Sequence, residues 1–162
     1  MGREKNEYYL ELAQNVSKRS ACRRRKFGAV LIRDDSVLST GYNGSVRKAK
    51  NCGLDTPCLK DLKNEPHYTS YVHCPAVHAE VNAVLNAARL GVSTIGSTCY
   101  LGVTGGHRAG PCQGCRRVLL NAGVNSIVYY DILGEMIIET RTDWIMKENK
   151  WMEDKENELQ TD

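Results

Sequence analysis

The chain has 162 residues, of which 41% are hydrophobic and 25% are charged. This length allows one domain with its own buried core, so we expect a single domain over residues 1–162. The formal net charge of +3 is too small to argue for nucleic-acid binding, although it is compatible with small anionic ligands. No apolar stretch reaches membrane-spanning length and the polar residues 1–7 lack a signal-peptide core, which predicts a cytoplasmic protein with no membrane partner.

The chain contains seven cysteines. An odd count, in a chain of this length without an export signal, favours thiols used as metal ligands over a disulfide framework. Reducing conditions suit that use.

Apolar residues at helical spacing predict an amphipathic first helix over residues 5–20. A short apolar run over 29–32 then predicts a strand, Asp34-Asp35 a turn, and residues 37–42 a returning strand. That strand ends at Asn43-Gly44, which can be a turn and nothing more.

Periodicity fails over residues 45–75, and a structureless connection of that length is uncommon in a compact domain unless something else holds it. Residues 78–90 are apolar nearly all round and stop at Gly91, which predicts a buried helix. The rest of the chain predicts a strand over 98–103, a helix from the Cys112 region to 121, strands over 126–130 and 136–138, and a polar helix over 142–159.

Cys112 and Cys115 follow a proline and precede an apolar-periodic run. On the first turn of a helix both sulfurs face the same side and can hold one metal ion, and a helix start favours thiolate over thiol. The pair alone is compatible with a redox site, half of a structural zinc site, or one end of a catalytic zinc site.

His78-Ala79-Glu80 favours the catalytic site. With Cys112 and Cys115, His78 completes three N/S ligands, and the fourth tetrahedral position stays open for a water molecule. Zinc lowers the pKa of such a water from about 15.7 to about 7. Glu80 does not share a helix face with His78, so we expect it to move protons beside the metal and not to bind the metal.

These motifs resemble the cytidine/deoxycytidylate deaminase superfamily, in which His-x-Glu is followed by Pro-Cys-x-x-Cys, and the dCMP deaminases in particular. The resemblance covers about residues 8–131. It also includes Arg25-Lys26-Phe27-Gly28-Ala29-Val30, Gly41-Tyr42-Asn43-Gly44, Cys74-Pro75-Ala76-Val77 before His78, and Asn121-Ala122-Gly123-Val124. It implies an α/β fold, a three-layer α-β-α cytidine deaminase-like domain with a mixed sheet of roughly five strands, to which residues 132–162 add a strand and a helix.

The resemblance implies zinc-dependent hydrolysis of dCMP to dUMP with release of ammonia, which feeds dTMP synthesis, and Glu80 as the proton-transfer residue. The same chemistry leaves open another cytosine-type nucleoside, base or nucleotide, or a polynucleotide. An aromatic content of 7% offers few stacking groups for a polynucleotide, so we expect no stable nucleic-acid partner. A non-catalytic zinc-binding module would instead fill the fourth position with a protein side chain.

Substrate contacts are expected from Ala79 and from Asn43, which the resemblance assigns to the sugar hydroxyl. The glycine-rich loop over 104–110 is longer than the family pattern. It either cradles the 5′-phosphate together with Arg108 or forms a flexible cover. Tyr129 either lines the base pocket or is a core aromatic.

The basic stretch Arg24-Arg25-Lys26 is interpreted as a site for the phosphates of the substrate or of a nucleotide effector, and a solvated face is the alternative. The resemblance implies effectors, because dCMP deaminases are typically activated by dCTP and inhibited by dTTP. These enzymes are commonly hexamers, so the resemblance also implies a homo-oligomer, with a hexamer favoured. Trp144 and Trp151 are expected either at an oligomer interface or against the chain's own sheet.

A second, structural zinc ion is expected in the non-periodic segment, because several dCMP deaminases look similar there and carry one. The expected ligands are Cys22, Cys52 and Cys74, with a fourth from Cys58, His67 or His73. Buried free thiols and solvent-facing imidazoles are the alternative.

Overall fold

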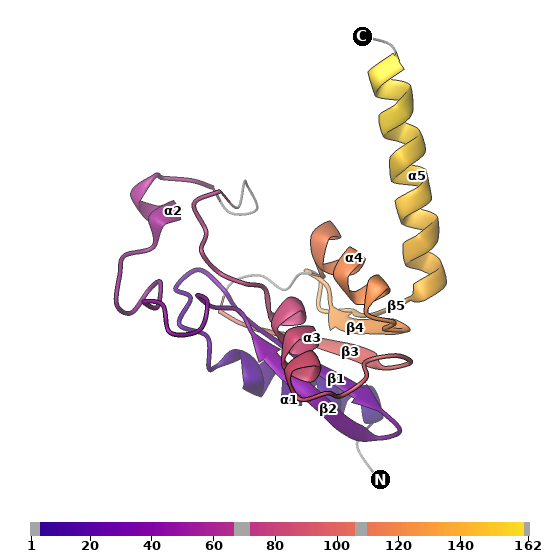
Figure 1. Ribbon diagram of the computed structural model, residues 1–162, viewed down its shortest axis with the longest axis horizontal. Coiled ribbons are helices and arrows are strands. Elements are labelled where there is room, and N and C mark those ends of the chain that lie inside the picture. The colour runs from indigo at the N-terminus through magenta and orange to yellow at the C-terminus, as the bar shows by residue number, and fades with distance from the viewer. Residues whose placement is uncertain (1–3, 67–71, 106–109, 161–162) are drawn as a thin grey trace.

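The computed structural model describes residues 4–66, 72–105 and 110–160 (Figure 1). His67 and Arg108, two of the predicted site residues, lie outside these ranges. The elements are α1 (Lys5–Ser17), β1 (Lys26–Arg33), β2 (Ser36–Tyr42), α2 (Leu59–Leu62), α3 (Ala79–Arg89), β3 (Thr98–Thr104), α4 (Gln113–Asn121), β4 (Ser126–Tyr130), β5 (Met136–Thr140) and α5 (Arg141–Gln160). They follow the order expected from the sequence, with the short α2 as an addition.

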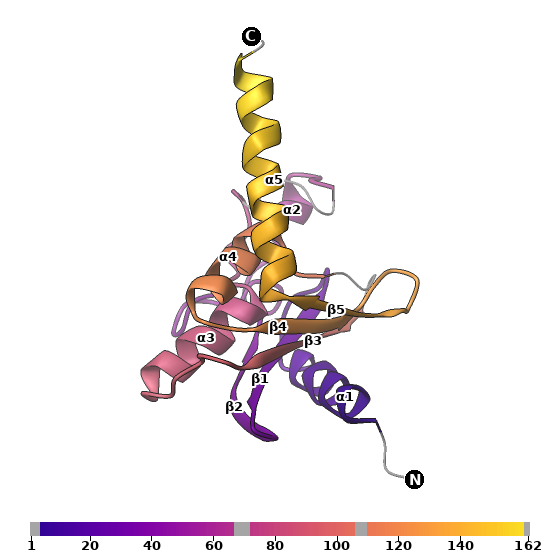
Figure 2. The same cartoon turned by 90° about the vertical axis from the view of Figure 1, so that its right-hand side faces the viewer.

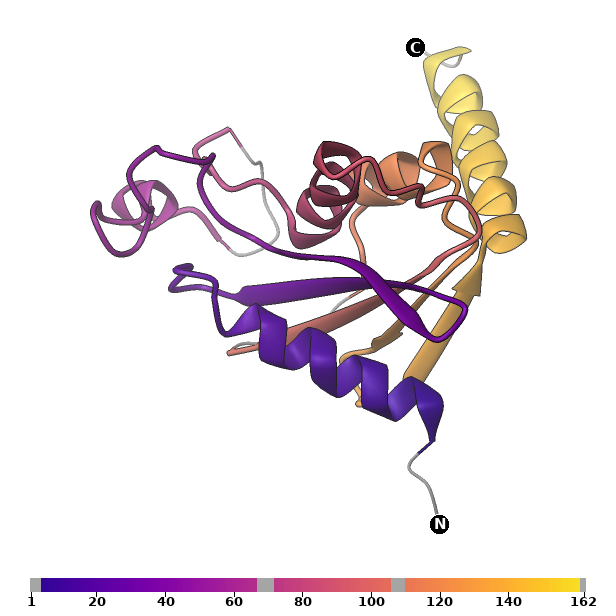
Figure 3. The ribbon, with the colours of Figure 1, turned by 60° about the horizontal axis from the view of Figure 1, so that its bottom comes forward.

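The strands form one mixed sheet in the order β2-β1-β3-β4-β5. β3 and β4 are parallel, and the other neighbouring pairs are antiparallel. α1 covers one face of the sheet, while α3 and α4 lie on the opposite face (Figure 3). This is the three-layer α-β-α arrangement that the resemblance implied.

The turn between β1 and β2 lies at Asp34 and Asp35, as the sequence predicted. Their φ angles are 50° and 60°, both in the left-handed region. Two left-handed residues form the kind of tight turn whose twist matches an antiparallel hairpin. The hairpin brings the segment around Asn43, which follows β2, beside the start of β1, and Asn43 N–H donates to the Phe27 carbonyl at 3.2 Å.

β1 is buried on both faces, which explains its continuous apolar run. Ala29 and Leu31 belong to the core shared with α3, while Val30 and Ile32 belong to the core shared with α1. A strand in the middle of such a sheet needs apolar residues at every position, so alternation is absent from its sequence.

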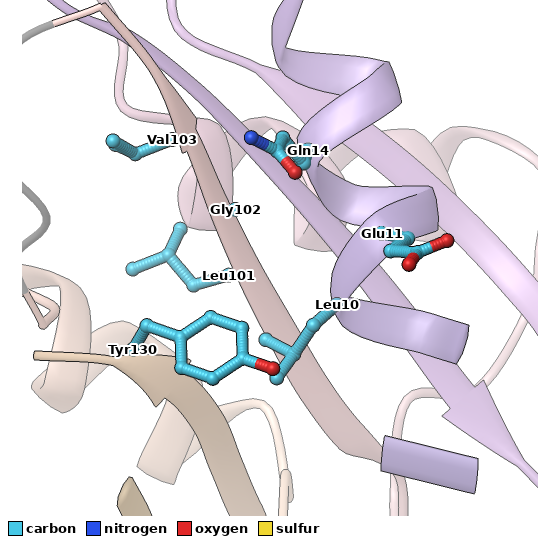
Figure 4. Close-up of a pocket in the computed structure, with 7 residues that line it drawn as sticks. All are labelled: Leu10, Glu11, Gln14, Leu101, Gly102, Val103 and Tyr130. Atoms are coloured by element: carbon cyan, nitrogen blue, oxygen red, sulfur yellow. The ribbon is translucent and has the colours of Figure 1, made fainter. Parts of the chain in front are cut away.

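α1 lies in close backbone contact with β3. A Cβ atom at Gly102 would lie 2.2 Å from the backbone nitrogen of Gln14, so any larger residue would push the helix off the sheet. Figure 4 shows a small pocket beside this contact, where Leu10 and Tyr130 face each other. No cysteine or histidine lines this pocket, so it offers no site for a soft metal ion.

α3 is buried on one face only, which corrects the prediction of a helix buried all round. Ala79, Ala83 and Ala87 are fully buried, whereas Leu85 is 49% exposed. The small alanine side chains let α3 approach β2 closely, and its apolar outer residues were misread as core.

α5 begins at the sheet edge and then projects away from the body of the molecule (Figures 1 and 2). Trp144 in its first turn is 1% exposed and belongs to the core. Trp151 is 40% exposed, and the Arg117 guanidinium carbon lies 4.8 Å from its ring centre. Trp144 therefore packs against the chain's own core, the second of the two alternatives, whereas a place for the half-exposed Trp151 at an oligomer interface stays a prediction. Along the described residues, no helix is both long enough and apolar enough to cross a bilayer.

Candidate metal centre

His78 and Cys112 occupy equivalent positions, each immediately before the first turn of a helix, α3 and α4 respectively. Cys115 lies one turn further along α4, and its backbone N–H donates to Sγ of Cys112 at 3.4 Å. Cys112 thus caps its own helix. Because the two helices pack side by side, their starts bring one imidazole and two thiols together.

The donor atoms of His78, Cys112 and Cys115 all lie within 4.8 Å of one another. Nδ1 of His78 is 3.2 Å from Sγ of Cys115 and 3.5 Å from Sγ of Cys112. A tetrahedral zinc ion, with bonds of about 2.3 Å to sulfur and about 2.0 Å to nitrogen, requires ligand separations of roughly 3.5–3.8 Å. The donor set therefore fits zinc, with Nδ1 as the imidazole ligand and a fourth position not filled by a protein side chain of the group.

One of the two thiols is poised to be a thiolate. The hydrogen bond from the Cys115 side chain, aided by one from His78, lowers the pKa of Cys112 to about 4 although burial opposes this. The same hydrogen bond to Cys112, together with burial, raises the pKa of Cys115. Metal binding then needs the release of one further proton, from Cys115.

Glu80 lies in the first turn of α3 and is 4% exposed. Burial raises the pKa of its carboxyl above the ordinary value. A buried carboxyl two residues from a metal ligand, with its pKa moved toward neutrality, can both accept and return a proton. This agrees with the role expected of Glu80 from the sequence, which stays a prediction.

One cavity joins the metal donors to a group of cationic side chains. Its lining includes His78, Glu80 and Cys112 together with Arg24, Arg25 and Lys60. The sequence analysis missed Lys60, which lies on α2 in the segment without periodicity. Only the folding of that segment over the cavity brings Lys60 to the site, so no local pattern could have found it.

Arg24 is held in place by the segment that contains α2. Its Nε donates to Asp61 at 2.7 Å and its Nη2 to the backbone carbonyl of Glu65 at 2.8 Å. Lys26, at the start of β1, does not line the cavity. The predicted effector stretch is thus divided by the fold, and its effector role stays a prediction.

Asn43 lines the same cavity and uses its amide to hold the segment before β1. Its Oδ1 accepts from the Phe27 backbone N–H at 2.8 Å, and its Nδ2 donates to the Arg25 carbonyl at 3.0 Å. The residue therefore does more than form a turn. Ala79 also lines the cavity, and contacts of both residues with a substrate stay predictions.

Tyr129 belongs to the buried core and does not line the cavity. Its hydroxyl donates to Oε1 of Glu139 at 3.1 Å. This places its side chain in the core, one of the two alternatives, and a contact with a base stays a prediction.

The residues expected to hold a second zinc ion are less closely grouped. Cys22 and Cys74 line the cavity, and His73 pairs with Glu65. Within residues 4–66, 72–105 and 110–160, the group of His78, Cys112 and Cys115 is the one set of three clustered metal donors. A second site involving Cys52 and Cys58 therefore stays a prediction.

Residues 3–131 match the family model described as the cytidine and deoxycytidylate deaminase zinc-binding region. The chain belongs to this family. The match includes the zinc donors and Glu80 and ends directly after β4. A catalytic zinc ion in this deaminase family member is therefore supported both by the family and by the donor geometry.

Two relatives of this deaminase family member are named deoxycytidylate deaminase. The protein from Mycobacterium phage D29 is 35% identical over 129 residues, a match of 76% of this chain and 92% of the relative. The protein from Schizosaccharomyces pombe is 32% identical over 133 residues, a match of 77% of this chain. The match covers only 36% of the yeast protein's own length.

Solved structures agree with this family. The dCMP deaminase of cyanophage S-TIM5 in complex with dCMP and dUMP has a TM-score of 0.60 at 29% identity, over 78% of this chain and 81% of that one. A cytidine deaminase from Burkholderia pseudomallei, with a TM-score of 0.56 at 17% identity over 85% of this chain and 94% of that one, shares the fold.

Proposed function

We propose that this protein hydrolyses dCMP to dUMP with release of ammonia and so supplies the precursor of dTMP in the cytoplasm. One observation carries the proposal: a single cavity is lined both by metal donors with Glu80 and by Arg24, Arg25 and Lys60. The nucleobase needs the first set and a 5′-phosphate needs the second. The cyanophage relative solved with dCMP and dUMP supports the same substrate.

The chemistry divides between the metal and Glu80. Zinc held by His78, Cys112 and Cys115 would supply a water molecule that loses a proton near neutral pH. Glu80 accepts that proton and delivers it to the ring nitrogen, where it stays in the product. Glu80 then takes the second proton of the water from the added hydroxyl group and gives it to the leaving amine. The water oxygen becomes the new carbonyl oxygen of the base, and the amine leaves as ammonia.

The cationic wall, by which we mean Arg24, Arg25 and Lys60 in the lining of the cavity, favours a substrate that carries a phosphate. Arg24 is already oriented by Asp61, and guanidinium groups pair well with phosphate oxygens. Arg25 and Lys60 lie in the wall of the same cavity. Deoxycytidine and cytosine, which lack the phosphate, would lose this part of the binding energy.

A substrate panel tests the proposal directly. Ammonia release is measured from dCMP, deoxycytidine, cytosine and single-stranded DNA, with the highest kcat/KM expected for dCMP. Arg25→Gln should lower kcat/KM for dCMP and leave that for deoxycytidine unchanged. Arg47→Gln is the matched control, because Arg47 bonds Asn86 outside this cavity.

The panel also decides against the alternatives. Equal kcat/KM for dCMP and deoxycytidine would favour a nucleoside deaminase, and higher turnover of DNA would favour a polynucleotide deaminase. Either result contradicts the proposal.

We also propose a second zinc ion held by Cys22, Cys52 and Cys74, with a fourth ligand from Cys58, His67 or His73. Burial raises the pKa of the Cys52 thiol, and nearby Cys58 and Cys22 add to the shift, so these thiols lie near one another. Metal analysis of the purified protein should then give two zinc ions per chain. A value of one, unchanged in Cys52→Ser, would contradict it.

Regulation by dCTP and dTTP in a homo-hexamer is a further part of the proposal. The basic stretch Arg24-Arg25-Lys26 extends from the substrate cavity to Lys26 outside it, and its positive charge favours binding of anionic nucleotides. Activation by dCTP and inhibition by dTTP are expected in the dCMP assay, with the mass of a hexamer in light scattering. Rates independent of both nucleotides would exclude this regulation.

A further inference from the structure

A buried carboxylate, Glu139 of β5, collects hydrogen bonds from three other elements. Its side chain is 7% exposed. The donors are Arg116 of α4, Tyr129 of β4, and Trp144 and Lys147 of α5. Donor distances run from 2.7 Å for Lys147 Nζ to 3.2 Å for the second nitrogen of Arg116. So many hydrogen bonds to one buried carboxylate hold its position and link the three elements that donate them.

The first connection leads to Cys115. Arg116, the next residue on α4, donates through two guanidinium nitrogens at 3.1 Å and 3.2 Å to the two carboxylate oxygens. A two-point contact of this kind restricts both distance and orientation. It therefore limits rotation of the first turn of α4, on which the Cys115 thiol faces His78.

The second connection leads to Cys112. The Tyr129 hydroxyl donates to Glu139 at 3.1 Å, and the Tyr129 ring lies directly against Gly110. A Cβ atom at Gly110 would lie 2.6 Å from Cζ of Tyr129. Gly110 precedes Cys112 by two residues, so the position of the Tyr129 ring determines where the cysteine segment can run.

The third connection leads out of the region matched to the family. Trp144 Nε1 and Lys147 Nζ donate to Glu139 at 2.8 Å and 2.7 Å, and both residues lie beyond residue 131, where the family match ends. Burial opposes ionisation of Glu139, but hydrogen bonds from Lys147, Arg116 and Trp144 outweigh it and lower the pKa to about 2. The carboxylate is therefore charged at neutral pH.

We propose that Glu139 is a positioning residue for the metal centre, and that it couples α5 to the zinc ligands. Its carboxylate holds Arg116 on one side of the cysteine pair and Tyr129 on the other, so that both thiols face His78. Glu139 contacts neither the substrate cavity nor the metal donors. The inference rests on the proposed function, because it assumes that zinc binds at these donors.

Glu139→Gln tests the inference, because the amide keeps the size of the side chain, removes the charge and turns an NH₂ group toward incoming donors. The readouts are the rate of zinc release to a chromogenic chelator, the absorption spectrum after Co²⁺ substitution, and the kinetics on dCMP. We expect zinc release to become about tenfold faster and the Co²⁺ spectrum to shift. We expect kcat to fall while KM stays within about twofold, because the cationic wall is untouched.

Tyr100→Phe is the control for a general loss of stability. It removes one hydroxyl, which donates to Asn6 at 2.8 Å on the α1 face of the sheet, away from α4. It should lower the unfolding temperature and leave zinc release and the Co²⁺ spectrum as in the wild type. If Glu139→Gln behaves like this control, the carboxylate is only structural and the inference is overturned.

Tyr129→Phe provides a milder second variant in case Glu139→Gln fails to fold. It keeps the ring against Gly110 and removes one donor, so zinc release should increase in the same direction but less. The double variant should release zinc more slowly than the product of the two single effects predicts, because both act through one contact. Unchanged zinc release in Tyr129→Phe would overturn the inference even if Glu139→Gln is insoluble.

The zinc content of the wild type separates this inference from the proposed function. A wild type with no zinc at His78, Cys112 and Cys115 would contradict both the proposed function and the role of Glu139. A wild type that holds this zinc and deaminates dCMP, with variants that release the metal at the wild-type rate, would overturn only the role of Glu139.

Discussion

Nδ1 of His78 lies 3.2 Å from Sγ of Cys115, although 37 positions separate the two residues in the chain. The contact arises because β3 returns the chain between α3 and α4. Both helices therefore start at the same end of the sheet's strands. A helix start offers unpaired N–H groups and the positive end of the helix dipole. Here the starts of α3 and α4 both face the same group of metal donors. The metal donors therefore come together because α3 and α4 pack side by side on the sheet. Substituting one donor tests the metal site, and substituting a core residue serves as the control.

Removing one ligand should empty the site. Cys115→Ala is expected to contain one zinc ion fewer per chain than the wild type, measured by atomic emission, and to lose ammonia release, because the two remaining ligands hold zinc weakly. Cys99→Ala is the matched control, because Cys99 is fully buried in β3 and belongs to the core. It should retain the metal. Full zinc content in Cys115→Ala would contradict the assigned donor set.

Glu80→Gln should keep the metal and lose the reaction. Without a carboxylate to accept and return the proton, kcat on dCMP is expected to fall by at least about 100-fold at unchanged zinc content. Glu156→Gln makes the same chemical change on the exposed end of α5, where the Glu156 side chain accepts from Nε2 of Gln160 at 3.1 Å, and should be neutral. A wild-type rate in Glu80→Gln would remove Glu80 from the mechanism.

Any side chain at Gly41 should destabilise the fold, because α3 lies too close to β2 at this position. A Cβ atom there would lie 2.3 Å from the backbone nitrogen of Ala83, so Gly41→Ala must displace the helix that carries Glu80. We expect a loss of about 2 kcal/mol in the free energy of unfolding, measured by chemical denaturation. Gly44→Ala, where the nearest atom would be 4.0 Å away, should change stability by less than about 0.5 kcal/mol. Equal stability of the two variants would contradict the packing described.

The stabilising effect of Glu139 should depend on pH in one direction. Hydrogen bonding against the cost of burial lowers its pKa from 4.5 to about 2 in the folded state, so its contribution is complete above about pH 4.5 and is lost as the pH falls toward 2. The difference in free energy of unfolding between the wild type and Glu139→Gln should therefore be larger at pH 7 than at pH 3. Both proteins are measured in EDTA so that acid release of zinc does not contribute. A difference independent of pH would contradict the low pKa.

Local patterns in the sequence were sufficient for most of the helices and strands and for the metal donors. The run over 29–32, the turn at Asp34 and Asp35 and the spacing of Cys112 and Cys115 each express a rule that acts over a few residues. The predictions from these rules hold in the folded protein because turn geometry and helix capping depend only on neighbouring residues. The family resemblance then joined His78 to the cysteine pair.

Tertiary structure alone decided which charged residues meet. Lys60 lies in a segment without periodicity, and Glu139 is one polar residue in a polar C-terminal stretch, yet one lines the cavity and the other is buried among four donor side chains. Their environments come from elements distant in the chain, and a carboxylate or ammonium group becomes informative only when its partners and its loss of solvent are known. The sequence by itself determined the metal chemistry, while the packing of the layers decided what surrounds it and what holds it in place.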